Sequence, residues 1–268
     1  MNTILSDGDG VRSLDVAYPV LECHKVSKAF DGVRAVDEVT LRCSPGAITA
    51  LVGPNGAGKT TLFNLLSGTL QADSGDVFFK RQSIRGIPPW KLARNGIGRL
   101  FQDVRVFERL SVLDNVLVAA AGPASASITD ALFRRSRISR EQGVLLDRAR
   151  THLAEVGLLE AERRPAAALS FGQQKLLALC RLLAQESELL LLDEPAAGVA
   201  PAMRELLGNV VRTLARKGRT ILMIEHDMEL VKGLAQHIVS MANGRVVAAA
   251  PTSEFLNQAA ATRAAAGL

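Results

Sequence analysis

The amino-acid sequence predicts an α/β fold with an N-terminal antiparallel β layer and an inserted α-helical subdomain. Three observations lead to this prediction. Short β-branched runs fill about the first eighty residues, whereas residues 111–183 carry apolar residues at helical spacing. After residue 188, short apolar runs alternate with amphipathic helices, as in the core of an α/β protein.

The N-terminal strands are expected in four runs of β-branched and apolar residues. Turn-forming clusters separate these runs, among them residues 44–46 and 73–76. Closely spaced strands of this kind favour an antiparallel layer near the start of the chain. The expected strands cover residues 20–23, 39–42, 48–52 and 77–79.

The middle of the chain is predicted to be helical. Leu145, Ala149, Leu153 and Val156 recur at the spacing of one helix face, and Gly157 suits the position just after the helix.

The last third alternates strands and helices. Residues 189–192 and 221–224 are apolar throughout, as strands buried on both faces are. Between them, Pro201 suits the first turn of an amphipathic helix. The apolar stripe of that helix consists of Met203, Leu206, Leu207, Val210, Val211 and Leu214. A further helix and two strands are expected over residues 228–235, 238–241 and 245–248.

The composition excludes several classes of protein. Of the 268 residues, 48% are hydrophobic and 22% are charged, which is ordinary for a globular protein. The apolar runs are far shorter than a membrane span, and residues 1–18 lack the pattern of a secretory signal. Cys23, Cys43 and Cys180 show no paired CxxC spacing, which argues against disulfides and zinc and fits a reducing cytoplasm.

The net charge of +5 allows an anionic partner such as a membrane surface or a nucleic acid. However, the chain has only 9 Phe, 1 Trp and 1 Tyr, and none of them lies in a basic run as in a base-stacking surface. A nucleic-acid partner is therefore not expected. The densest basic stretch, residues 134–140, is predicted to be a solvated surface segment, with partner or membrane contact as the alternative.

Residues 53–60, GPNGAGKT, match the phosphate-loop pattern GxxxxGK[ST] between an expected strand and a helix over residues 61–66. Glycines let backbone N–H groups converge on phosphate oxygens, and the N-terminus of the helix adds partial positive charge. Lys59 is expected to reach the β- and γ-phosphates, and the Thr60 hydroxyl to ligate Mg²⁺. A plain glycine turn before a helix is the alternative; the combined pattern favours a nucleotide site.

Two carboxylates follow the apolar run 189–192. Ionised groups beside a core are costly, so a purely structural role is the weaker interpretation. Successive strand side chains point in opposite directions, so Asp193 and Glu194 cannot share one role. Asp193 is expected to hold Mg²⁺ through a water molecule. Glu194 is expected to act as the general base that activates the attacking water.

Residues 169–175, LSFGQQK, precede an apolar helix that runs to Ala184. Ser170 followed by Gln173 has the spacing of a capping box, so ordinary helix capping is one interpretation. A capped helix N-terminus with a nearby glycine is also an anion site.

These motifs together resemble an ABC-transporter ATP-binding subunit. They occur in the order of that family: the phosphate loop, Phe101-Gln102, residues 169–173, residues 189–194 and residues 224–227. Stretches such as FQDVRVFERLSVLDNV, LDEPAAGVAP and IEHDMELV are similar to the branched-chain amino acid importer branch. The resemblance covers nearly all of residues 20–256. It implies a P-loop NTPase core of the ABC ATPase type, and ATP hydrolysis that powers uptake of branched-chain or related amino acids.

The resemblance also implies that two ATPase subunits, identical or different, pack head to tail. Ser170, Gly172 and Gln173 then serve the ATP bound on the opposite subunit. Gln102 contacts the metal and the attacking water, and leads into the segment that receives the coupling helices of the membrane subunits. His226 binds the γ-phosphate, with a plain strand-end histidine as the alternative.

Phe30 is implied to stack on adenine, with core packing as the alternative. The expected nucleotide-binding residues are thus Phe30, Gly53, Pro54, Asn55, Gly56, Ala57, Gly58, Lys59, Thr60, Thr61, Ser170, Gly172 and Gln173. The expected catalytic residues are Lys59, Gln102, Glu194 and His226, and the expected metal-binding residues are Thr60, Gln102 and Asp193.

Two positions depart from the family pattern. Phe171 replaces the common first glycine of the signature pair, while Gly172, where the backbone must approach closely, is present. Ala200 stands where many members have Asp and offers no side-chain hydrogen bond, so weakened or asymmetric coupling between the paired sites is expected.

The expected organisation has five segments: a flexible leader (1–18), the first part of the ATP-binding core (19–102), a helical subdomain with the signature (103–184), the second part of the core (185–250), and a C-terminal helix with an Ala-rich tail (251–268). The implied partners are a second ATPase subunit, integral membrane permease subunits and, indirectly, an extracytoplasmic solute-binding protein. The expected location is peripheral, on the cytoplasmic face of the inner membrane.

Three alternatives remain at this point. A soluble ABC-type ATPase acting on DNA or ribosomes usually has two cassettes or a long coiled-coil insertion, whereas this chain has one phosphate loop and a short insert. A P-loop GTPase or kinase leaves residues 169–173 unexplained, and the chain has no [NT]KxD motif. A non-catalytic ATP-binding module is the third, and turnover measurements distinguish it.

Overall fold

A computed structural model of the chain describes residues 18–121 and 135–265, with the side chains of 121, 135–142 and 259–265 excepted. The expected leader up to residue 17, the side chains of the basic stretch 134–140 and residues 266–268 of the tail lie outside the described residues.

An antiparallel sheet is formed by N-terminal strands, as predicted. Its order is β2-β1-β4-β5, and each neighbouring pair is antiparallel. The first two strands are longer than expected because irregular pairings let them continue past residues 23 and 39. The strands are β1 (Leu21–Phe30), β2 (Val33–Cys43), β4 (Ser74–Phe79) and β5 (Gln82–Ser83).

The second sheet has the order β10-β9-β3-β8-β7-β6, and all its pairings are parallel except that of β10 with β9. Residues 48–52 belong to this sheet, so their assignment to the antiparallel layer was wrong. All five residues of this strand are buried, as in a strand covered on both faces. The strands are β3 (Ile48–Val52), β6 (Ile97–Leu100), β7 (Leu189–Asp193), β8 (Thr220–Ile224), β9 (His237–Ala242) and β10 (Arg245–Pro251).

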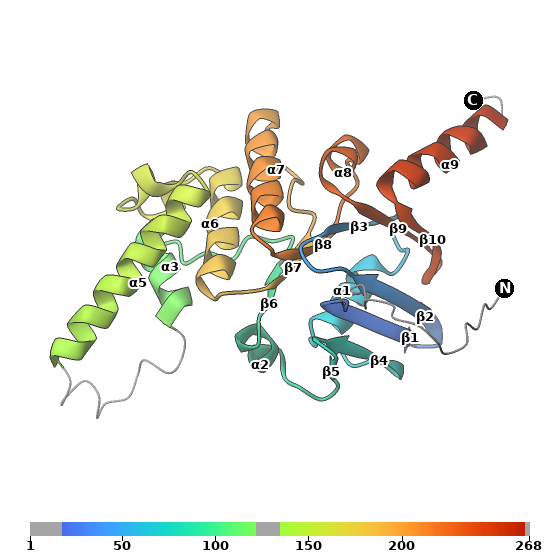
Figure 1. Ribbon diagram of the computed structural model, residues 1–268, viewed down its shortest axis with the longest axis horizontal. Helices are drawn as coiled ribbons and strands as arrows, with labels where there is room; N and C mark the ends of the chain where they lie inside the picture. The colour runs from blue at the N-terminus through green and yellow to red at the C-terminus, as the bar shows by residue number, and fades with distance from the viewer. Residues whose placement is uncertain (1–17, 122–134, 266–268) are drawn as a thin grey trace, which may run out of the picture.

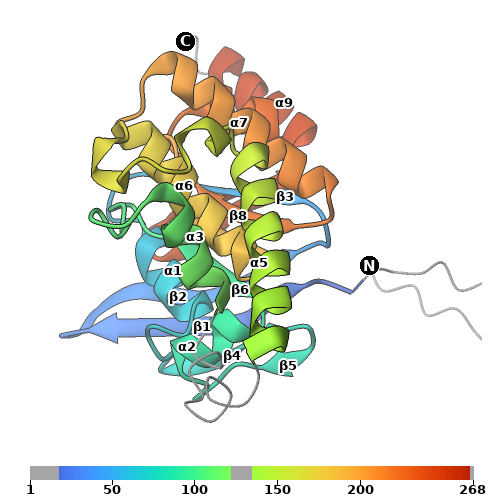
Figure 2. The same cartoon turned by 90° about the vertical axis from the view of Figure 1, so that its left-hand side faces the viewer.

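Helices cover both faces of the parallel sheet (Figures 1 and 2). They are α1 (Lys59–Leu66), α2 (Pro89–Arg94), α3 (Val112–Ala121), α5 (Arg135–Glu155), α6 (Phe171–Ala184), α7 (Pro201–Arg216), α8 (Met228–Leu234) and α9 (Thr252–Ala265). Helix α5 ends just before Gly157, whose φ of +72° favours glycine, as predicted.

Two hydrophobic clusters lie on opposite faces of the parallel sheet. Along β7, Leu190 and Leu192 pack into the cluster under α3, α5, α6, α7 and α8, whereas Leu189 and Leu191 pack into the other. The second cluster holds α1 between the parallel and antiparallel sheets. The helix that follows the phosphate loop is therefore packed on both sides, which fixes the loop.

Two elements that position the site were not predicted from the sequence. Strand β6 contains Gly98 and Arg99, so it shows no apolar run; it forms because it pairs with β7. Helix α2 is only six residues long and begins with Pro89. Among the described residues, no helix is both long enough and apolar enough to cross a membrane.

Candidate active site

The predicted phosphate-side residues gather at one edge of the parallel sheet. The phosphate loop follows β3, Gln102 follows β6, Glu194 follows β7 and His226 follows β8. Because these strands are parallel, their carboxyl ends lie side by side, where α/β proteins bind ligands.

The glycines of the phosphate loop are required by close packing. A Cβ on Gly53 would lie 2.1 Å from the carbonyl oxygen of Met241, and a Cβ on Gly58 would lie 2.1 Å from that of Ala35. Both glycines also have positive φ, +147° and +94°. The loop is thus wedged between the end of β9 and the start of β2.

The phosphate loop presents unpaired donors. Among the described residues, no protein acceptor pairs with the backbone N–H groups of Gly56, Gly58, Lys59 and Thr60. The Lys59 ammonium donates to the carbonyls of Gly53 and Pro54, both at 2.8 Å. Burial lowers the pKa of Lys59, while the nearby Glu194 and Asp193 carboxylates oppose that shift. This donor set fits a polyphosphate.

Asp193 is buried at the end of β7 and pairs with a buried arginine. Its Oδ2 lies 3.3 Å from the guanidinium of Arg99, and both side chains are less than a tenth exposed. Burial raises the pKa of Asp193, and Arg99 opposes that shift. The ion pair uses one carboxylate oxygen, which leaves the other for a metal ion or its water ligand.

Arg99 is a site residue that sequence reasoning missed. Besides Asp193, its guanidinium donates to Asn64 Oδ1 at 2.7 Å and to Ser67 Oγ at 2.9 Å, both on or next to α1. The Phe101 ring lies 4.6 Å away. A single side chain therefore ties the phosphate-loop helix to Asp193. Its place two residues before Phe101 was the available signal.

Glu194 joins two other predicted catalytic residues. Its Oε1 lies 3.0 Å from His226 Nε2, and its Oε2 accepts from Gln102 Nε2 at 3.2 Å. The Glu194 backbone has φ +47°, a left-handed conformation that is costly for a residue other than glycine. Such a conformation at a carboxylate that points into a cluster of functional groups is typical of active sites.

Residues 169–173 lie away from the phosphate loop of the same chain, since α6 and α1 are well separated in Figure 1. The capping interpretation is confirmed: Ser170 Oγ accepts from the Gln173 N–H, and Gln173 Oε1 accepts from the Ser170 N–H. Gly172 faces its own chain, because a Cβ there would lie 2.4 Å from Met203 Cγ.

Phe30 lies at the end of β1 and is 46% exposed, so it is not packed in the core. The Lys28 ammonium lies 5.6 Å from the centre of its ring. Phe30 pairs with Val33 across the turn that leads to Ala35, the residue in contact with Gly58. An exposed aromatic side chain therefore stands at the end of the hairpin whose second strand contacts the phosphate loop.

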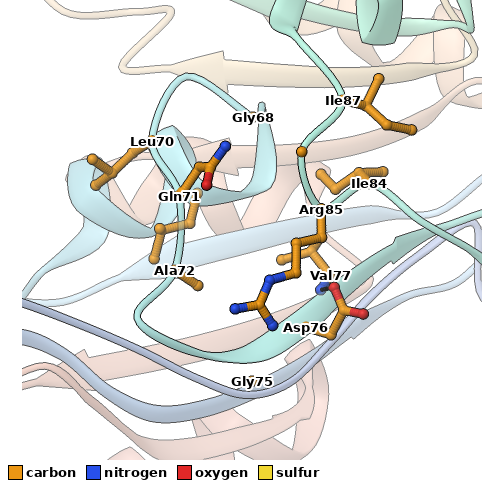
Figure 3. A pocket seen from close by; sticks show the side chains of 12 residues that line it. Gly68, Leu70, Gln71, Ala72, Gly75, Asp76, Val77, Ile84, Arg85 and Ile87 are labelled. Atoms are coloured by element: carbon orange, nitrogen blue, oxygen red, sulfur yellow. Dashed lines mark hydrogen bonds between the residues drawn. The ribbon is translucent and has the colours of Figure 1, made fainter.

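A surface groove of about 350 Å³ runs beside the Gln102 segment. Trp90 and Phe101 supply apolar surface, and Arg105 and Arg181 supply positive charge. A separate cavity of about 40 Å³ lies between the end of α1 and the β4–β5 hairpin (Figure 3). It contains none of the predicted site residues and has space for only about two or three water molecules.

Two further buried charges near Glu194, those of Lys175 and Glu225, had no predicted role. Lys175 ends the stretch 169–175, and Glu225 directly precedes His226; these places were the only signals.

A phosphate loop after one strand of a parallel sheet, together with two carboxylates at the end of another strand of the same sheet, defines a P-loop nucleoside-triphosphatase. The sequence pattern described as "ABC transporter" matches residues 36–197. The chain belongs to the ABC transporter family.

The chain is similar to proteins of known role over nearly its whole length. It is 36% identical over 250 residues to the high-affinity branched-chain amino acid transport ATP-binding protein LivG of Escherichia coli (strain K12), covering 93% of this chain and 98% of that protein. It is also 36% identical to the high-affinity branched-chain amino acid transport ATP-binding protein BraF of Pseudomonas aeruginosa. This match covers 87% of this chain and 92% of that protein.

Solved structures agree with the fold. The ADP conformation of MJ1267, an ATP-binding cassette of an ABC transporter, superposes with a TM-score of 0.78 and 34% identity, covering 89% of this chain and 94% of that one. A nucleotide-free ATP-binding cassette from an ABC transporter superposes with a TM-score of 0.77 and 33% sequence identity, covering 90% of this chain and 94% of that one.

Proposed function

We propose that this chain is the ATP-hydrolysing subunit of an ABC importer that takes up branched-chain or related amino acids through separate membrane subunits. The observation that carries the hydrolytic role is the Glu194 cluster, in which Gln102 and His226 hold both oxygens of one carboxylate at the sheet edge that bears the phosphate loop. The amino-acid class rests on the names of the relatives. A soluble ABC ATPase outside transport is not favoured, because these relatives are transport subunits.

The chemistry follows from the placement of the groups. The loop N–H groups bind phosphate oxygens, and Lys59 exchanges its bonds to the Gly53 and Pro54 carbonyls for bonds to the phosphates. Glu194 accepts the proton of the attacking water as a general base. Gln102 and His226 orient its carboxylate, and His226 is exposed enough to reach a terminal phosphate as well.

The residues present fit a magnesium ion. Thr60, Gln102 and Asp193 offer hydroxyl, amide and carboxylate oxygens, the hard ligands that Mg²⁺ binds together with phosphate and water. When bound, Mg²⁺ neutralises charge on the phosphates. Arg99 holds Oδ2 of Asp193 and so orients the carboxylate.

A second ATPase subunit completes the site in this proposal. The nucleotide of the partner subunit is contacted by Ser170, Gly172 and Gln173. Phe30 stacks on the adenine of the nucleotide bound to its own subunit. Two facts support this assignment: α6 lies away from the phosphate loop of its own chain, and its capped N-terminus begins at the exposed Ser170.

Membrane permease subunits are the second partner. We assign their docking to the groove beside Gln102. Its aromatic surface, with the positive charge of Arg105 and Arg181 exceeding the negative charge of Asp103, suits an apolar helix with acidic residues. A subunit docked there works peripherally on the cytoplasmic face of the inner membrane, with an extracytoplasmic solute-binding protein delivering the solute. Residues 103–184 then act as the helical subdomain between two parts of the ATP-binding core, 19–102 and 185–250.

The test is Mg²⁺-ATP turnover by the wild type and by Glu194→Gln, alone and with the membrane subunits. Glu194→Gln is expected to lower kcat by about 10²–10⁴ and to leave ATP affinity within about twofold, because it removes the base and no phosphate contact. Glu188→Gln is the matched control, since its half-exposed carboxylate pairs only with Lys80 in the described part of the chain. A wild-type rate no higher than that of Glu194→Gln contradicts the proposal.

A further inference from the structure

A buried lysine in α6 reaches the loop that carries the catalytic carboxylate. Lys175 is only 2% exposed, and its ammonium donates to the carbonyls of Glu194 at 3.0 Å and Ala197 at 2.8 Å. These two carbonyls begin and end a turn, because the Ala197 N–H donates to the Glu194 carbonyl at 3.1 Å. A buried ammonium is costly unless its charge and donors are used, so this contact is specific.

A buried carboxylate holds the same turn from the other side. Glu225 follows β8 and is 4% exposed; its Oε1 accepts from the Ala196 N–H at 2.9 Å and its Oε2 from the His226 N–H at 3.3 Å. Burial lowers the pKa of Lys175 and raises that of Glu225, and each charge opposes the shift of the other. A cation on two carbonyls of the turn and an anion on one of its N–H groups, that of Ala196, thus fix the turn.

The turn determines where the Glu194 side chain points. Its left-handed backbone, φ +47°, is not one that the residue adopts by preference. Released from the contacts of Lys175, the backbone can relax to ordinary φ values, and the carboxylate then moves away from Gln102 and His226.

We propose that Lys175 is a positioning residue for ATP hydrolysis: its ammonium holds Glu194 in the left-handed conformation and makes the aim of that carboxylate depend on the placement of helix α6. The inference rests on the hydrolytic function proposed above. Ser170 caps the same helix. A ligand or subunit that moves the N-terminus of α6 therefore also moves the Lys175 ammonium, which is bonded to the Glu194 carbonyl.

The test compares Lys175→Met with the double variant Lys175→Met/Glu225→Gln, which leaves no uncompensated charge buried and so protects folding. Both are expected to lower kcat by about 10²-fold with ATP affinity within about twofold, because a misplaced base fails while the phosphate contacts remain. Leu179→Ala is the control: it removes buried packing from α6 and neither of the two hydrogen bonds of Lys175, and so is expected to lower Tm but leave kcat within about threefold. A kcat within threefold of wild type in the double variant overturns the proposal.

Amide hydrogen exchange in the nucleotide-free protein separates this claim from the hydrolytic one. The amides of residues 194–199 are expected to exchange about tenfold faster in the double variant than in Leu179→Ala, measured at equal global stability. Equal exchange rates in the two variants overturn the claim that Lys175 holds the turn, even if the wild type is an active ATPase. Failure of the wild type to exceed Glu194→Gln overturns the function instead, and the exchange result still decides whether Lys175 holds the turn.

Discussion

Two side chains from separate segments meet at the carboxylate of Glu194. Gln102 and His226 each contact a different oxygen of Glu194, so each restricts its rotation. At the scale of single residues, the direction of a charged side chain is set by such contacts and by the backbone beneath it. Replacing either neighbour is therefore expected to change the reaction without removing the proposed base.

His226→Ala is expected to lower kcat by about tenfold or more, because Glu194 loses one of its two orienting contacts. In the Glu194→Gln background the same change is expected to have almost no further effect, since residues that act as a unit are not additive. Steady-state turnover of the four variants measures this. His237→Ala is the control, because His237 begins β9 and so lies at the sheet edge opposite to the site. An equal loss there contradicts a specific role for His226.

Ala200 occupies the N-cap of α7 and offers no side-chain hydrogen bond to the helix. Ala200→Asp is expected to raise the free energy of unfolding by about 1 kcal/mol, because its carboxylate can accept from a free N–H of the first turn. Denaturant unfolding checks this. Ala202→Ser, inside the first turn, is the matched control and is expected to change stability by less than about 0.5 kcal/mol. Equal effects of the two substitutions contradict the capping argument.

At the scale of elements, α6 and α7 pack closely at a glycine. A Cβ on Gly172 would meet Met203 Cγ at 2.4 Å and Val199 Cγ1 at 3.2 Å. The glycine of the signature therefore has a packing reason within its own chain, beside the role toward a partner's nucleotide proposed above.

Gly172→Ala is expected to lower the free energy of unfolding, because overpacking of about 1–3 kcal/mol exceeds the helix propensity gained, about 1 kcal/mol. In a Met203→Ala background the same change is expected to cost less, because the nearest contact, that with Met203 Cγ, is gone. Chemical unfolding of the double-mutant cycle measures the difference. Gly143→Ala in α5, with open space at the Cβ position, is the control and is expected to stabilise in both backgrounds. The idea fails if Gly172→Ala costs the same with and without Met203.

The elements with strong local signals were predicted and those that depend on distant partners were not. Strands β7 and β8 are apolar runs, and their prediction was confirmed. Strand β6 was missed because Arg99 looks like a surface residue until Asp193 neutralises it. On α7, Leu206 was expected in the buried stripe, yet it is 38% exposed, because periodicity alone does not reveal how wide the covered face is.

The site follows the same division. The phosphate loop, Asp193 and Glu194 are short consecutive motifs, so the sequence alone was enough to predict a role for each of them, and these roles stay predictions. Lys175 and Glu225 could not, because burial of a charge is decided by segments far away in the chain. Which helix N-terminus serves which nucleotide depends on a second subunit and stays a prediction.

At the scale of the whole molecule, Asp37 joins the two sheets. Its carboxylate accepts from Arg34 on its own strand and from Arg245 at the start of β10. These hydrogen bonds, Arg245 first, lower the pKa of Asp37. A lowered pKa in the folded state means that the contribution to stability is present above the unfolded value, about 3.9, and is lost as pH falls through the folded value.

Asp37→Asn is therefore expected to lower the free energy of unfolding at pH 7, and the difference from wild type is expected to shrink as pH falls below about 4. Denaturant unfolding at several pH values measures this. Asp31→Asn, which removes an exposed carboxyl from the nearby turn, is the control. A difference that stays constant down to the lowest accessible pH contradicts the ion-pair argument.

The close packing of Gly58 against the Ala35 carbonyl affects the thermal unfolding of the protein. The phosphate loop contacts β2 of one sheet and β9 of the other. A nucleotide bound to the loop is therefore expected to stabilise both sheets together, so that they unfold as one cooperative unit. Saturating ATP should then raise the melting temperature of the whole protein in a single step and slow deuterium uptake in β1 and β2, strands that supply no phosphate contact.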